Sequence, residues 1–309
     1  MTEEPDLQKP RFGPDSSLPD PSSPQGLRLA ANLDGSWRLL GLMADHLYST
    51  ELEMIEGALK TIVEGGDVEP RLHERPWTLT SLAQGMLTTA HAVLRETKAR
   101  DIDSAYILAR ALVERAINFS YLAVAAEEEV SNWVAYSRQK KLRLLVRRGD
   151  AGSIRYQLHP EVTLDDLPEE ARLDLEQFTS PKSGREITRW TRLSLEQRIA
   201  ALDGGFDRWK FPATWLLQAM TNVYAIGAEA QHGTLLGVGL PLGLLAFPGE
   251  SVNDHLGILL LAVIQCMESG IETLAYLTGH QEWASEAMEA FQETIGLMQE
   301  PFAGTQPPA

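Results

Sequence analysis

Two nearly charge-free stretches with helical spacing constrain the fold of this chain more than any other feature. The first covers residues 104–126 and contains Arg110 and Glu114, which lie one helical turn apart. The second covers residues 212–231 and is followed directly by His232. A helix that is apolar on all sides is usually buried, and a buried charge needs either a partner or a function. We therefore expect a helical core that holds a small polar site.

Apolar residues recur at helical spacing along most of the chain, which predicts an all-α fold. We expect a multi-helix bundle whose core is formed by the helices that begin near residues 36, 80, 104, 129, 212 and 252. No convincing pair of strands is expected. The predicted helices cover residues 36–64, 80–99, 104–126, 129–148, 168–178, 195–202, 212–231, 252–278 and 281–299.

Proline-rich segments set the predicted ends of the folded part. Six prolines occur among Ser, Asp and Gly residues within residues 1–24, and such a composition buries too little apolar surface to fold. The segment after Pro301 has a similar composition. We therefore predict disordered tails at residues 1–34 and 300–309, and a single helical domain over residues 35–299.

Charge and cysteine content limit the possible partners and the cellular location of the protein. The net charge of −16 makes nucleic acid an unfavourable partner, because a polyanion would be repelled at long range. The single cysteine, Cys266, excludes an intrachain disulfide and a thiolate metal cluster, which favours a reducing, cytoplasmic location. No export signal is found at the N-terminus. Of the two most apolar stretches, residues 235–248 are broken by glycine and proline, and residues 256–267 are too short to span a bilayer. No membrane association is therefore expected.

Arg110 and Glu114 admit two interpretations, because their spacing of four residues places them on one face of a helix. The favoured interpretation is a structural ion pair that joins helices. The alternative is a charged floor for a ligand pocket.

Tyr224, Glu229 and His232 form the second polar set. Tyr224 and His232 lie two turns apart on nearly one face, and the helix C-terminus favours the protonated form of His232. This histidine is interpreted either as a structural cap or as a pocket residue. Glu229 and His232 also have the Glu-x-x-His spacing of carboxylate-bridged di-metal bundles, but those sites need a second copy of the motif. We therefore predict no metal site and no other cofactor.

A cluster of cations stands out in this acidic chain. We favour a solvated helix face whose charges complement the helix C-terminus. The alternative is a patch for phosphate or nucleic acid. The cluster consists of Arg138, Lys140, Lys141, Arg143, Arg147 and Arg148.

The run from Ala109 to Leu122 resembles the signature helix of a family of prokaryotic all-helical proteins that carries a domain-of-unknown-function label. Its Arg-x3-Glu pattern is matched by Arg110 and Glu114, and the tyrosine of its next helix by Tyr136. Its later Tyr-x3-Ser-x3-His helix is matched from Tyr224 to His232, with Ala228 in place of the serine. The resemblance covers roughly residues 80–280. It implies an all-α fold and a shared polar site, without a known activity.

Two classes of function stay open. The favoured one is a ligand-sensing or protein-interaction module with a buried polar site. Its expected partner is a small molecule or another protein, and a homo-oligomer is compatible with this class. The alternative is a hydrolase that acts on nucleic acid or nucleotides, with His232 as acid or base and Arg110 holding an anion. The sequence contains no phosphate-binding glycine loop and no nucleophile elbow, which favours the first class. The candidate site residues are Arg110, Glu114, Tyr136 and His232.

Overall fold

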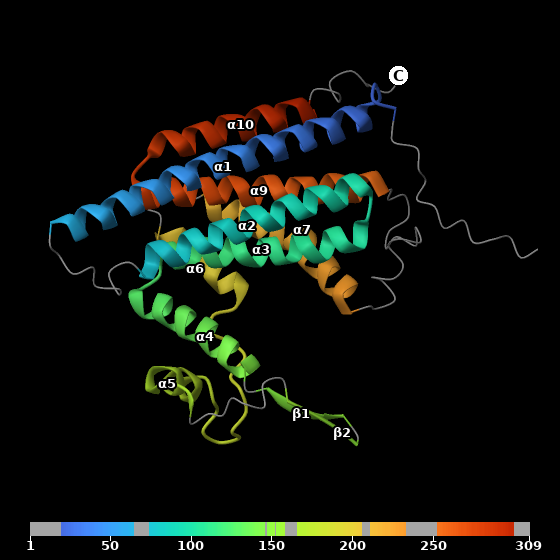
Figure 1. The fold of residues 1–309 in the computed structure, drawn as a ribbon. Helices are drawn as coiled ribbons and strands as arrows, with labels where there is room; N and C mark the ends of the chain where they lie inside the picture. The colour runs from blue at the N-terminus through green and yellow to red at the C-terminus, as the bar shows by residue number, and fades with distance from the viewer. Residues whose placement is uncertain are drawn as a thin grey trace, which may run out of the picture.

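A computed structural model describes residues 20–64, 74–145, 147–151, 153–157, 166–205, 211–232 and 252–299. The described part is built almost entirely of helices, so the predicted all-α fold is confirmed (Figure 1). The helices are α1 (Pro24–Val63), α2 (Glu74–Ala99), α3 (Ile102–Val124), α4 (Glu127–Leu145), α5 (Glu169–Gln177), α6 (Leu195–Gly205), α7 (Phe211–His232), α9 (Val252–Thr278) and α10 (Gln281–Gln299).

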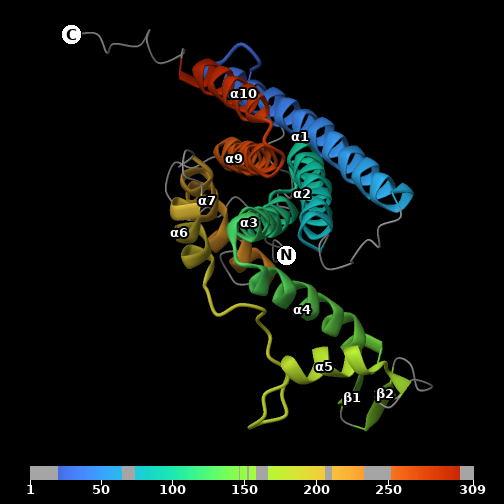
Figure 2. The ribbon, with the colours of Figure 1, turned by 90° about the vertical axis from the view of Figure 1, so that its left-hand side faces the viewer.

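Helix α9 forms the centre of the bundle. Figure 2 shows it surrounded by α1, α2, α3, α7 and α10. Every residue from Leu259 to Ala275 except Leu261 is buried, and Gly279, with a φ of 79°, ends the helix. In the described part of the chain, α9 is the one helix long and apolar enough to cross a membrane, and 89% of its apolar window lies inside the bundle.

Helix α3 is, after α9, the second helix that contributes many buried residues to the core. The Asp101 side chain accepts a hydrogen bond from the backbone N–H of Ser104 and so forms the N-cap of this helix. Tyr106, Leu112 and Phe119 are fully buried and belong to the same apolar core as α2, α7 and α9. This packing fixes the orientation of the polar residues that α3 carries.

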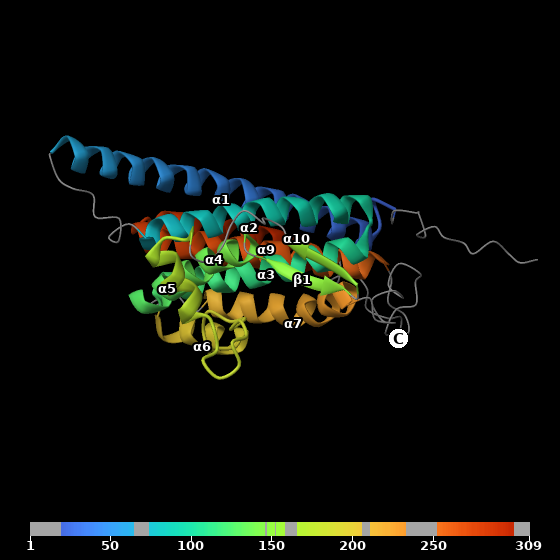
Figure 3. The ribbon, with the colours of Figure 1, turned by 60° about the horizontal axis from the view of Figure 1, so that its bottom comes forward.

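The prediction that the fourth helix belongs to the bundle core is wrong. Helix α4 leaves the bundle and carries α5 and a short hairpin away from it, as Figures 1 and 2 show; in the view of Figure 3 these elements lie in front of the bundle. Only Val130, Ala135 and Gln139 of this helix are buried, because its second half is basic and binds acidic groups of the lobe rather than the apolar core. Helix α10 instead packs on α1 and α9.

The hairpin was not expected from the sequence. Strand β1 (Arg148–Ala151) pairs antiparallel with β2 (Ile154–Gln157), and Gly149 lies opposite Tyr156. Each strand has four residues, which is too short for an alternating pattern to be distinguished from helical spacing. We call α4, the hairpin, α5 and the segment up to residue 187 the lobe.

The predicted N-terminal tail is too long. Helix α1 begins at Pro24, where proline suits the first turn of a helix, so residues 24–34 are helical rather than disordered. Ala31 is buried, and Leu29 and Leu33 pack against the core, which supplies the apolar contacts that order this turn. The other tail predictions, for residues 1–19 and 300–309, and the apolar stretch at residues 235–248 lie outside the described residues.

Candidate functional site

Helices α3 and α7 approach closely at Gly227. A side-chain Cβ at this position would lie 2.6 Å from the backbone oxygen of Tyr106 and 2.8 Å from the Cβ of Arg110. Only glycine fits without displacement of one helix. The close approach brings Tyr224, one turn earlier on α7, against Arg110 and Glu114.

These three side chains form a directed hydrogen-bond chain. Arg110 Nη2 donates to the Tyr224 hydroxyl at 3.3 Å, and this hydroxyl donates to Glu114 Oε1 at 2.7 Å. The Arg110 guanidinium also lies 4.7 Å from the Tyr224 ring centroid and donates to Gln231. Burial and then the bond to Glu114 raise the pKa of Tyr224, which keeps its proton on the hydroxyl.

The predicted ion pair exists but differs from the expected buried form. Arg110 and Glu114 approach to 3.8 Å, with side-chain exposures of 19% and 42%. Glu114 therefore faces solvent from the edge of the bundle, and it borders a cavity. Of the two interpretations given above, the structural pair describes Arg110, and Glu114 also belongs to a pocket wall.

This cavity has a volume of about 400 Å³ and lies between the bundle and the segment that leads back from the lobe. Helices α3, α6 and α7 form one side of it, and residues 188–194 form the other. Its lining residues are Glu114, Asn118, Thr188, Arg189, Trp190, Thr191, Leu193, Ser194, Leu195, Glu196, Arg198 and Tyr224.

Arg198 is the charged group most deeply set in the cavity wall. Its guanidinium donates to the Asn118 side-chain oxygen and lies 5.4 Å from the Trp190 ring centroid. Among the described residues, no carboxylate lies within 4.0 Å of its nitrogens. Burial lowers the pKa of Arg198 against the opposing effect of the Glu114 charge. A cation with only neutral partners at a cavity wall can bind an anion.

Tyr136 does not join the Arg110 cluster. Its hydroxyl donates to the backbone oxygen of Thr188 at 2.8 Å, and its ring packs edge-on against Phe178 with centroids 5.2 Å apart. Tyr136 therefore anchors one end of the segment that lines the cavity, but Tyr136 itself is not a lining residue.

His232 is exposed at the end of α7 and does not line the cavity. The described residues give it no hydrogen-bond or ion-pair partner. Within the ranges that the structure describes, no group of three or more His, Cys, Asp or Glu side chains is placed to hold a metal ion, and this includes Glu229 and His232. The expected site thus holds Arg110 and Glu114 together, with Tyr136 and His232 outside that cluster.

The basic residues of α4 hold the lobe together. Arg138 binds the buried carboxylate of Asp174 with two hydrogen bonds, at 2.7 and 3.2 Å. Lys140 pairs with Glu186, which raises the pKa of Lys140 and lowers that of Glu186. Arg143 donates to the Phe178 backbone oxygen at 3.0 Å. Arg138, Lys140 and Arg143 are thus partly exposed, as a solvated face requires, but they also bind acidic or carbonyl groups of the lobe.

Most of the residues that line the cavity were not predicted as site residues. Arg198 lies in the predicted helix over residues 195–202, Trp190 lies before it where no helix is predicted, and Asn118 lies within the apolar stretch of residues 104–126. The available sign of a site was that Arg198 lies on a helix that begins shortly after Trp190. It was weak, because the contact joins positions 80 residues apart.

The fold and the site define an all-α protein with a polar cavity between a helical bundle and the segment that leads back from a small lobe. Residues 77–239, just over half of the chain, match the Family of unknown function (DUF5677), and the chain belongs to this family. The expected domain of unknown function is thereby confirmed. No curated protein and no solved structure matches the chain.

The matched segment contains the whole candidate site. Every residue that lines the cavity, and all of Arg110, Tyr136, Tyr224 and His232, fall between residues 77 and 239. The core helix α9 and both helices of the outer layer, α1 and α10, lie outside it.

Proposed function

We propose that this protein is a ligand-sensing module whose cavity binds a small molecule with an anionic group. The observation that carries the proposal is the partly buried Arg198 guanidinium, whose hydrogen-bond partners among the described residues are neutral. The charges of Glu114 and Glu129 favour this cation only from beyond ion-pair distance, and a partly buried charge without a direct counter-charge is unfavourable. A bound carboxylate, phosphate or sulfate group would provide that counter-charge with charge-assisted hydrogen bonds.

The remaining wall would select among anions. Glu114 accepts hydrogen bonds and repels negative charge, so it favours a ligand whose second end carries hydrogen-bond donors. Trp190 offers an aromatic face beside Arg198. The cavity of about 400 Å³ falls within the size range of small-molecule sites. We therefore infer a compact polar ligand rather than a polymer.

The sensing part of the proposal rests on residues 188–194. This segment lines the cavity, and the hydrogen bond from Tyr136 to Thr188 connects its first residue to α4. A ligand that ordered the segment would also bias the position of the lobe. The lobe would then offer another protein a surface that depends on ligand.

The hydrolase alternative has less support. It would need His232 and Arg110 in one cleft, and neither residue lines the cavity. Arg110 is engaged by Gln231 and Tyr224. A hydrolase that used this cavity would take one of its lining carboxylates, Glu114 or Glu196, as the base, and a Glu114→Gln or Glu196→Gln variant that abolished turnover of a nucleotide would favour it.

Native mass spectrometry of the purified full chain tests the proposal. We expect an excess mass from a copurified small molecule, lost in Arg198→Met and retained in Arg192→Met, which removes the same charge from an exposed position outside the cavity. Equal retention in both variants would contradict a role for Arg198. If no adduct is found, the purified chain is titrated with inorganic phosphate, citrate and a nucleoside monophosphate.

A further inference from the structure

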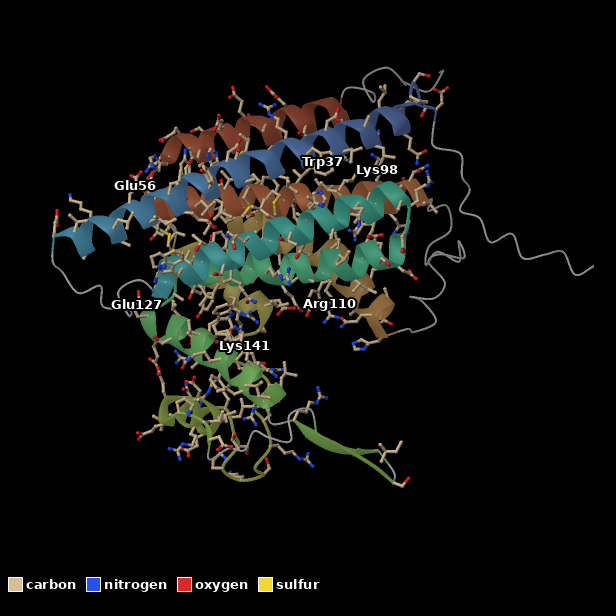
Figure 4. The ribbon with its side chains drawn as sticks, in the orientation of Figure 1. Trp37, Glu56, Lys98, Arg110, Glu127 and Lys141 are labelled. Atoms are coloured by element: carbon tan, nitrogen blue, oxygen red, sulfur yellow. The ribbon has the colours of Figure 1, made fainter. Side chains whose placement is uncertain are left out.

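The outer face of α1 carries an apolar stripe that nothing covers in the described structure. Its residues are between 41% and 84% exposed and recur at helical spacing. Figure 2 shows α1 at the outer edge of the molecule, and Figure 4 labels Trp37 and Glu56 along it. The stripe consists of Trp37, Tyr48, Leu52, Ile55, Leu59 and Val63.

The stripe lies on the side of α1 opposite its buried face. Met43, Leu47 and Thr50 are buried against the bundle, and the exposed apolar residues lie about half a turn away from them around the helix. A helix that is apolar on both sides is typical of a fully covered position. A contiguous exposed apolar surface of this kind is typical of an interaction site.

The charged residues beside the stripe indicate what covers it. Four of them lie on one flank of α1 in the order acidic Asp34, basic Arg38, acidic Glu56 and basic Lys60, and Asp45 lies between the two pairs on the same flank. If a second α1 runs antiparallel to the first with the two Leu47 residues at the same level, each acidic member of these two pairs lies opposite a basic residue of the other helix. We propose that α1 packs antiparallel against α1 of a second copy of this chain.

One register satisfies both charge pairs. Reversal about Leu47 sets Asp34 opposite Lys60 of the second copy, and Arg38 opposite Glu56 of the second copy. In an antiparallel pair the same flanks face each other, and flanking charges set partner choice and orientation. Asp45 then faces Ser49 rather than another acid. The two-fold symmetry makes each of these contacts twice.

The same register fits the apolar side chains. Trp37 falls between Ile55 and Leu59 of the second copy. Leu52 falls against Gly41 and Ala44, where a Cβ on Gly41 would meet nothing within 4 Å and the space is open. Large residues thus meet small ones, as interdigitating helices require.

The contacts that these charges make within the chain do not prevent the pairing. Arg38 is paired with Glu293, and Lys60 lies 4.0 Å from Glu64, both at exposed positions. Exposed ion pairs contribute little and exchange easily. Trp37 keeps its edge-on contact with His91, 5.5 Å between centroids, because that contact is on its inner side toward α2.

Charge-swapped variants test the register. We expect the wild type to sediment as a dimer of the 34.2 kDa chain. Arg38→Glu and Glu56→Arg should each weaken the dimer roughly tenfold or more, because each puts like charges together at two symmetric places. The double variant should restore the wild-type dissociation constant. Circular dichroism of each variant shows whether the bundle is intact.

Cysteine pairing tests the same register without a charge change. Tyr48→Cys places one thiol of each copy beside the two-fold axis, so mild oxidation should give a covalent dimer. Leu59→Cys is the matched control, because the second copy presents Trp37 there and no thiol. The native Cys266 is buried and does not compete.

Three results would overturn the proposal. A monomer at all concentrations would show that the stripe is left to another protein or to other segments of the chain. A dimer that ignores the charge swaps, or one that Leu59→Cys links in place of Tyr48→Cys, would show a different interface or a parallel pairing.

Discussion

The Tyr224 hydroxyl lies 2.7 Å from Glu114 Oε1, and this bond joins α7 to α3 at the edge of the cavity. The same hydroxyl accepts from Arg110, so one phenol connects the cation and the anion that the sequence places a turn apart. The cluster therefore fixes Glu114, one of two carboxylates in the cavity lining. Arg198 is the less exposed of the two arginines there.

Tyr224→Phe should lower the free energy of unfolding by about 1 kcal/mol, because it removes one hydroxyl that both donates and accepts in a partly buried place. Urea denaturation measures the change. Tyr48→Phe, 63% exposed and without a hydrogen-bond partner among the described residues, is the control and should leave stability within about 0.5 kcal/mol when all variants are compared at one protein concentration, since Tyr48 lies on the proposed dimer face. Equal effects of the two substitutions would mean that the Tyr224 bond is not made in solution.

Gly227→Ala should destabilise the bundle by about 1–3 kcal/mol, because its Cβ would overlap the Tyr106 backbone of α3. Gly57→Ala is the matched control in another helix, since its Cβ meets nothing within 4 Å. We expect this control to stabilise by about 0.5–1 kcal/mol. Thermal unfolding of both variants checks the sign, and a neutral Gly227→Ala would contradict the close approach of α3 and α7.

The stability of the bundle should fall as pH rises toward neutrality, because α9 buries Glu268 and Glu272 one turn apart. Burial raises the pKa of Glu272 to about 7, and burial together with the Glu272 charge raises the pKa of Glu268 well above its ordinary value. The folded state therefore holds protons that the unfolded state releases above its ordinary glutamate pKa. Each raised pKa thus makes ionisation unfavourable in the folded state. For Glu272 the resulting loss of folding stability is complete above pH 7.

Glu272→Gln should remove much of this pH dependence, since for Glu272 the penalty reaches about 3 kcal/mol above pH 7. Denaturation curves between pH 5 and 8, about the interval in which Glu272 titrates, measure the slope. Glu289→Gln changes the same group at an exposed site of α10 and should leave the slope unchanged. A wild-type curve that is flat over this interval would show that the carboxyls are compensated by another charge.

Asp174→Asn should loosen the lobe and leave the bundle intact. It replaces a buried carboxylate that binds Arg138 twice, at an expected loss of about 1 kcal/mol, since Arg138 itself is half exposed. Hydrogen exchange should become faster in α5 and stay unchanged in α9. Glu170→Gln, 3.8 Å from the same arginine and 80% exposed, should have little effect, and exchange that rises equally in both helices would contradict a separate lobe.

The sequence was informative where structure is local. The predicted bounds of α9 and α10 agree with the structure, because an apolar run and the stop at Gly279 are encoded in neighbouring residues. Helix α4 was misplaced, since its helical pattern does not reveal that Asp174 and Glu186 bind its cations. The direction of a helix after its turn depends on those distant partners.

The same distinction applies to the site. Arg110 and Glu114 were found because their spacing on one helix is visible in the chain. Arg198 meets Asn118 only after α6 has packed on α3, and no spacing signal reports such a contact. His232 matched a helical pattern but lies two turns past Tyr224, beyond the part of α7 that borders the cavity.

The most direct test of the account is equilibrium binding of small anions to the purified chain. Inorganic phosphate, citrate and a nucleoside monophosphate are titrated into wild type, Arg198→Met and Arg192→Met, with calorimetry as the readout. We predict that at least one of these anions binds the wild type and Arg192→Met equally, and that Arg198→Met loses about tenfold or more in affinity. Binding that survives in Arg198→Met, or no binding of any of the three to the wild type, would contradict the assignment of this cavity as an anion site.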